Sequence, residues 1–118
     1  MEYISDFKTK QDFEKRVNES LKLNCKYPDR IPVIVDRAEK KGPDINCHKF
    51  LVPKDLTMAG FAHVLRARIN MKPSDALFIF IGNSNHVPSS ARMVELYKKH
   101  GDIDGFLYMS YALENTFG

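Results

Sequence analysis

The sequence has little of what a membrane span, a disulfide scaffold or a metal site requires. Its longest apolar run, Ala76 to Ile81, is six residues long, whereas a transmembrane helix needs about 20. Two cysteines lie 22 positions apart without a C-x-x-C pair, and the four histidines have no metal-ligand spacing with them. We therefore expect reduced thiols and no metal or other cofactor. No basic and apolar leader opens the chain, so we expect a cytoplasmic protein.

Charge of one sign is also scarce. The chain has 18 Lys and Arg against 15 Asp and Glu, a net charge of +3, which does not by itself indicate nucleic-acid binding. Residues 101–118 contain three acidic residues and no basic one, so the first hundred residues carry +6. A small nucleic-acid binder would need a basic stripe with exposed aromatic residues. The aromatic residues of the predicted strands alternate with aliphatic ones instead, and we expect no nucleic-acid partner.

The N-terminal segment has the period of an amphipathic helix. Apolar residues that recur every four positions predict a helix from Asp12 to Asn24, and this apolar stripe is expected to be its buried face. Thr9 followed by Asp12 resembles a capping box at the helix start. Leu23 lies about 200° around the helix from the last residue of the stripe, off the expected buried face. The stripe consists of Phe13, Val17 and Leu21.

Four apolar segments rich in β-branched or aromatic residues predict strands. They lie at residues 31–35, 48–52, 76–81 and 106–112. A charged turn separates the first two, which should therefore form a hairpin. All four segments are apolar on both faces, so we expect the sheet to be covered on both sides.

Two helices are predicted between these strands. Thr57 should cap the first, whose apolar residues fall on one stripe. Ser89 or Ser90 should cap the second, which ends at Gly101. The order of elements suits an α+β fold with the mixed sheet of a β-grasp, whose one face is covered by the Thr57 helix. The N-terminal helix is the only predicted element left to cover the other face.

Several short motifs in this order resemble those of the autophagy-related ubiquitin-like modifiers, the family that includes GABARAP. The resemblance runs from residue 13 to the final glycine, and several motifs in sequence are far more specific than a single one. The matching stretches are Phe13–Arg16 (FEKR), Tyr27–Val35 (YPDRIPVIV), Phe50–Pro53 (FLVP), Asp55–Thr57 (DLT), Asp75–Phe78 (DALF), Leu96–Tyr97 (LY), Phe106–Tyr108 (FLY) and Gly118.

The resemblance implies a ubiquitin-like β-grasp with an N-terminal helical extension. We accordingly expect residues 1–26 to form the helical extension, residues 27–112 the ubiquitin-like core, and residues 113–118 a flexible C-terminal tail. It also implies a substrate of conjugation rather than an enzyme. Ubiquitin-like activating and conjugating enzymes would join Gly118 to phosphatidylethanolamine, and a cysteine protease would process and deconjugate the protein. A terminal glycine suits such a reaction because no Cβ obstructs the attacking group.

The same resemblance implies that the protein recruits cargo receptors and autophagy machinery to autophagosomal membranes through aromatic-x-x-aliphatic peptides. The second strand of a β-grasp has a free edge that such a peptide can extend. Its side chains alternate, so Lys49 and Leu51 face one side while Phe50 and Val52 face the other. The implied aromatic pocket is lined by Glu19, Leu23, Pro32, Lys49, Leu51 and Phe106. The implied aliphatic pocket is lined by Phe50, Val52, Pro53, Leu56, Phe61, Val64 and Leu65, with Arg30 and Arg68 as flanking charges.

Two alternatives bear on this interpretation. A β-grasp adaptor that binds peptides but is never conjugated remains open. Cys47 and His48 could suggest a nucleophile and its base, but adjacent residues on a strand point to opposite faces. The sequence also leaves open which receptors are bound and whether the natural chain extends beyond Gly118.

Overall fold

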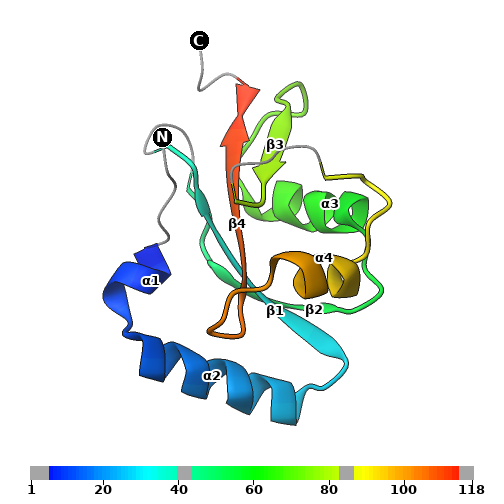
Figure 1. The fold of residues 1–118 in the computed structure, drawn as a ribbon. Coiled ribbons are helices and arrows are strands. Elements are labelled where there is room, and N and C mark those ends of the chain that lie inside the picture. The colour runs from blue at the N-terminus through cyan, green and yellow to red at the C-terminus, as the bar shows by residue number, and fades with distance from the viewer. Residues whose placement is uncertain (1–5, 40–43, 83–86, 115–118) are drawn as a thin grey trace.

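The structure, a computed structural model, describes residues 6–39, 44–82 and 87–114 (Figure 1). Helices pack on both sides of one four-stranded sheet. In chain order the described elements are α1 (Asp6–Lys10), α2 (Phe13–Lys26), β1 (Arg30–Arg37), β2 (Lys49–Pro53), α3 (Met58–Arg68), β3 (Leu77–Phe80), α4 (Met93–His100) and β4 (Leu107–Leu113).

The sheet has the strand order β2-β1-β4-β3, which is the β-grasp arrangement that the sequence predicts. β1 and β2 form the expected antiparallel hairpin. β1 and β4 run parallel at the centre, and β3 pairs antiparallel with β4. Because β1 and β4 are central, β2 and β3 form the two edges of the described sheet.

One face of the sheet carries the hydrophobic core beneath α3 and α4. Thr57 caps α3 as predicted, and its side chain accepts a hydrogen bond from Gly60 N–H (3.1 Å). The α3 residues that turn inward are buried against strand residues of the same face. This cluster includes Val33, Val35, Met58, Phe61, Leu65, Leu107 and Met109.

The start of α4 differs from the prediction. The helix begins after Arg92 rather than after Ser89 or Ser90, although it ends at Gly101 as expected. The segment before it forms a turn at Ser89 and Ser90, and its carbonyls are used by the start of α3, because Ala59 N–H donates to Ser89 O (3.0 Å) and Met58 N–H donates to Ala91 O (2.8 Å). Since these carbonyls already have partners in α3, the first turn of α4 is displaced toward the C-terminus.

The opposite face of the sheet is covered by α2, as the sequence predicts, and also by α1, and Figure 1 shows both helices on the side away from α3 and α4. The predicted buried face of α2 is wrong. Phe13 and Leu21 are 46% and 55% exposed, whereas Ser20 is the buried residue of this helix. The predicted cap is also displaced, since Asp12 itself accepts the Lys15 N–H (2.9 Å).

The third strand is less covered than the sequence predicts. As an edge strand, β3 buries none of its residues fully, and Phe78 is 38% exposed. The last strand has the predicted length but is shifted by one residue toward the C-terminus, because it begins at Leu107 and its last residue, Leu113, is buried and pairs with Leu77.

Candidate functional site: the free edge of β2

The outer edge of the sheet along β2 exposes backbone hydrogen-bonding groups. Val35 N–H donates to His48 O (2.8 Å), so every second residue from His48 onward, including Phe50, bonds toward β1. Lys49 and Leu51 therefore direct their N–H and C=O groups away from β1, where no further described strand lies. Such an edge is a template for an added strand.

Residues of the predicted aromatic pocket lie together on the α2 side of this edge. Pro32 of β1 is buried and is the register partner of Leu51 of β2, so the two side chains share a face. Phe106, which precedes β4, is 1% exposed. Its ring meets the ring of Phe7 edge to face, with 5.2 Å between centroids. Phe7 of α1 thus adjoins this face, although sequence reasoning did not assign it there.

An ion pair spans the same face between α2 and β2. Lys49 Nζ lies 2.6 Å from Glu19 Oε1 and 4.9 Å from the centre of the Phe7 ring. Leu23, one turn after Glu19 on α2, is half-buried. Because the Lys49 and Glu19 side chains remain 49% and 35% exposed, their pairing is worth little and can rearrange at small cost.

The residues of the predicted aliphatic pocket lie on the α3 side. Phe50 meets Phe61 edge to face, with 5.6 Å between ring centroids. Phe61 and Leu65 are fully buried, and Val52 is nearly so, so these three form the floor of this side. The accessible part is formed by the half-buried Phe50, Leu56 and Val64 and the exposed Pro53.

The remaining predicted residues are dispersed. Arg30 is exposed, and its Nη1 donates to Leu51 O (3.3 Å) at the edge of β2. Arg68 is the exposed last residue of α3. Gly118, the predicted conjugation residue, lies outside the described residues.

Cys47 and His48 do not form a nucleophile and base. The Cys47 thiol donates to Lys49 O (Sγ to O 3.1 Å) on the outer edge. The His48 ring points to the other side, where Nδ1 lies 2.8 Å from Val35 O and 3.0 Å from Asp36 Oδ1. The two side chains thus bind different partners on different sides of the chain, as the alternation of a strand predicts.

A polar cluster that sequence reasoning missed fastens α2 to the segment before β4. The buried Asp104 accepts hydrogen bonds from Arg16 Nη1 (3.1 Å), from Phe106 N–H (2.9 Å) and from the Tyr108 hydroxyl. Burial, together with the Asp104 bond and against the influence of Arg16, raises the pKa of Tyr108 well above its ordinary value. The phenol therefore stays protonated and remains a donor. Ser20 Oγ donates to Asp104 O from the same helix.

Close backbone approach accompanies this cluster. Gly105 has φ +93°, and a Cβ there would lie 2.8 Å from the Ser20 Cβ. A side chain at this position is excluded by both conformation and space. Because Ser20 and Gly105 are both small, α2 can lie directly on the segment before β4. This approach places Glu19 and Leu23 beside the edge of β2.

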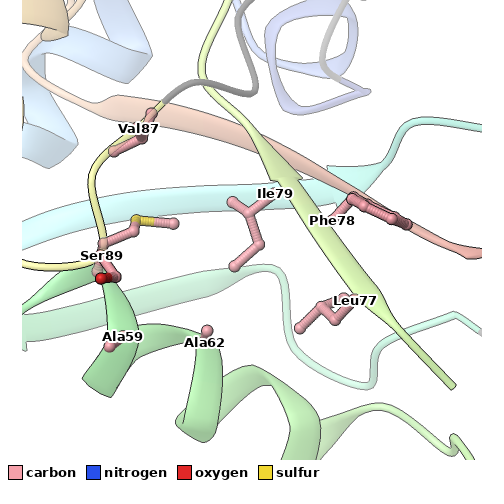
Figure 2. Close-up of a pocket in the computed structure, with 8 residues that line it drawn as sticks. Ala59, Ala62, Leu77, Phe78, Ile79, Val87 and Ser89 are labelled. Atoms are coloured by element: carbon pink, nitrogen blue, oxygen red, sulfur yellow. The ribbon is translucent and has the colours of Figure 1, made fainter. Parts of the chain in front are cut away.

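A hollow near the other edge of the sheet was also missed by sequence reasoning. It occupies about 190 Å³ between α3 and β3. Leu77 and Ile79 point from β3 toward Ala59 and Ala62 of α3, while Phe78 lies on the other side of the strand (Figure 2). The sequence assigned Leu77 and Ile79 to a strand that is covered on both faces. The hollow could not be predicted because it depends on the position of β3 at the edge of the sheet. The lining is completed by Met58, Phe78, Val87 and Ser89.

The β-grasp sheet, its two helical layers and the exposed edge of β2 define a ubiquitin-like protein. A family model described as "Autophagy protein Atg8 ubiquitin like" matches residues 15–118. The chain therefore belongs to the Atg8 family of ubiquitin-like autophagy proteins, as its motifs predict.

Relatives and solved structures agree with this assignment. The chain is 53% identical to autophagy-related protein 8d of Arabidopsis thaliana over 98% of this chain and 96% of the relative. It is 47% identical to autophagy-related protein 8 of Saccharomyces cerevisiae over 97% of each. The crystal structure of Trypanosoma brucei ATG8 matches with TM-score 0.87 and 38% identity over 95% of this chain and 97% of that one.

A further solved structure contains a partner. Plasmodium falciparum Atg8 in complex with a Plasmodium falciparum Atg3 peptide matches with TM-score 0.83 and 34% identity, over 92% of this chain and 96% of that one. Within the ranges that the structure of our chain describes, no helix is long and apolar enough to cross a bilayer.

Proposed function

We propose that this chain is a conjugated modifier of autophagy that binds aromatic-x-x-aliphatic peptides along β2. The free edge of β2, with an accessible apolar face on each side, is the observation that carries the proposal. A peptide strand paired with the outward groups of Lys49 and Leu51 would direct alternate side chains to the two faces. Its aromatic residue would enter the α2 side and its aliphatic residue the α3 side, with Arg30 and Arg68 attracting flanking acidic residues.

The proposal extends to conjugation. Gly118 would be activated and transferred by ubiquitin-like activating and conjugating enzymes to phosphatidylethanolamine, and a cysteine protease would process and release it. The two acyl chains of that lipid are what stable anchoring requires. The protein would then be cytoplasmic, with its lipidated form on autophagosomal membranes. The Atg3 peptide bound to the Plasmodium falciparum relative supports a peptide-binding surface in this family.

Truncation of the two faces tests peptide binding. Leu51→Ala on the α2 side and Phe50→Ala on the α3 side should each weaken a Trp-x-x-Leu peptide by about 1–3 kcal/mol, because each removes apolar contact area from a binding face. Calorimetry measures the affinity. Phe78→Ala is the matched control, since it removes an exposed aromatic residue at the opposite edge of the sheet. Unchanged affinity in both groove variants would contradict the proposed site.

A reconstituted reaction tests conjugation. The chain is incubated with the activating and conjugating enzymes, ATP and liposomes that contain phosphatidylethanolamine, and intact mass is measured. We expect a lipid adduct that Gly118→Ala abolishes. Peptide binding without any adduct would instead support the non-conjugated β-grasp adaptor.

A further inference from the structure

The outward carbonyls of β2 already accept hydrogen bonds from side chains of the same protein. Arg30 Nη1 donates to Leu51 O at 3.3 Å, and Cys47 Sγ donates to Lys49 O at 3.1 Å. These two carbonyls are the acceptors that an added strand would use. Both donor residues are exposed, so neither contact is enforced by surrounding packing.

We propose that Arg30 and Cys47 are displaceable caps of the β2 edge, and that Arg30 selects for extended partners that carry a carboxylate at its end of the strand. This inference rests on the proposed peptide binding for its second part, whereas the caps belong to the free protein. A strand that pairs with β2 replaces each cap with one of its own N–H groups. Arg30 acts here as a positioning residue.

The position of Arg30 determines which partner gains from the exchange. Arg30 is the register partner of Pro53, so it stands where β2 ends. Pro53 has no N–H, and Leu51 is therefore the last residue of β2 that can both donate and accept at the outer edge. A guanidinium displaced from Leu51 O loses its acceptor at this point. A carboxylate on the partner restores a charge-assisted bond, while a neutral partner does not.

The two caps are unequal. A guanidinium is a charged donor with a planar fork, whereas a thiol is a weak donor. Displacing Arg30 should consequently affect affinity more than displacing Cys47. General charge attraction and displacement of a cap also predict different results for a neutral peptide when Arg30 is removed: the first predicts unchanged affinity, whereas the second predicts tighter binding.

The binding experiment uses two Trp-x-x-Leu peptides, one with Gly and Ser flanks and one with Asp and Glu flanks, measured by calorimetry at fixed ionic strength. Arg30→Ala should tighten the neutral peptide by about two- to fivefold, because its binding no longer displaces a cap. The same variant should weaken the acidic peptide by about two- to fivefold. Lys99→Ala, which removes the same charge from the exposed end of α4, should change either affinity less than about twofold.

Carbon-13 NMR of the free protein tests the caps without any peptide. The Leu51 carbonyl resonance should move in Arg30→Ala, and the Lys49 carbonyl resonance should move more in Cys47→Ala than in Cys47→Ser, which keeps a donor. Unmoved carbonyls would overturn the caps. Moved carbonyls with weaker or unchanged neutral-peptide affinity would overturn selection by Arg30. If neither peptide binds the unmodified protein, the proposed function and this selection fail together, and moved carbonyls would still support the caps.

Discussion

The two helical layers that cover the sheet are attached in different ways. On one side, α3 and α4 bury large apolar side chains such as Phe61, Leu65 and Met93, none of which is exposed. On the other side, α2 buries Ser20 alone among its residues and leaves Phe13 and Leu21 half exposed. The first layer is part of the hydrophobic core, and the second is fastened by polar contacts.

This difference has an energetic meaning. Burial of a large apolar side chain stabilises a protein by about 1.5–3 kcal/mol, whereas a typical hydrogen bond contributes about 1 kcal/mol net. The α2 layer depends on a few directional contacts around Asp104, whose removal leaves polar partners unsatisfied. The layer that borders the proposed aromatic side of the β2 edge is thus the one with the weaker apolar attachment.

The largest predicted effect contrasts one phenylalanine from each layer. Phe61→Ala removes a fully buried ring from α3 and should lower the free energy of unfolding by about 3–5 kcal/mol. Phe13→Ala on α2 removes a ring that is 46% exposed and should change it by less than about 1 kcal/mol. Urea denaturation followed by circular dichroism measures both. Equal losses would mean that the two layers are attached alike.

An intermediate effect is expected from the polar cluster. Asp104→Asn keeps the shape of the side chain but replaces an acceptor with a donor that faces Arg16 and Tyr108. We expect a loss of about 2–3 kcal/mol, together with faster hydrogen exchange at α2 amides than at α3 amides. The matched control is Asp55→Asn, because the Asp55 side chain is 90% exposed. Uniform acceleration across both helices would contradict a role specific to α2.

The same contrast explains which parts of the fold the sequence could predict. The β1–β2 hairpin and the Thr57 cap depend on β-branched runs and on neighbours close in the chain, which are visible in any single sequence. The two faces of β2 follow from strict alternation. The contacts of Arg16 and Ser20 with Asp104 join residues 88 and 84 positions apart. No local period encodes them, and the apolar stripe of α2 was therefore assigned to the wrong face.

Parts of the candidate site were hidden for a similar reason. The edge of β2 could be predicted from strand order, whereas its occupation by Arg30 and Cys47 depends on side-chain reach across the sheet. The start of α4 depends on backbone bonds between residue 89 and the start of α3. Apolar residues such as Phe61 and Leu65 serve as core, and composition alone cannot separate a core residue from a pocket floor.

The smallest effect concerns how α1 is held, and it appears as pH dependence. Lys8 Nζ lies 2.6 Å from Asp102 Oδ1. Partial burial would raise the pKa of Asp102, but the Lys8 bond and the Asp104 N–H, together with the charge of Arg16, outweigh it and lower that pKa. A lowered folded-state pKa gives stability that is complete above the unfolded value of about 4 and is lost as pH falls through the folded value.

Asp102→Asn keeps an acceptor for the Asp104 N–H and removes only the charge. Denaturation between pH 6 and pH 3 should therefore show a flatter profile for the variant, with a difference below about 1 kcal/mol because the Lys8 side chain is 35% exposed. Lys8→Met should flatten the profile less than Asp102→Asn, because the Asp104 N–H and Arg16 still lower the pKa of Asp102. Adding Lys8→Met to Asp102→Asn should have no further effect on the slope, and additive slopes would assign the pH dependence to other carboxylates.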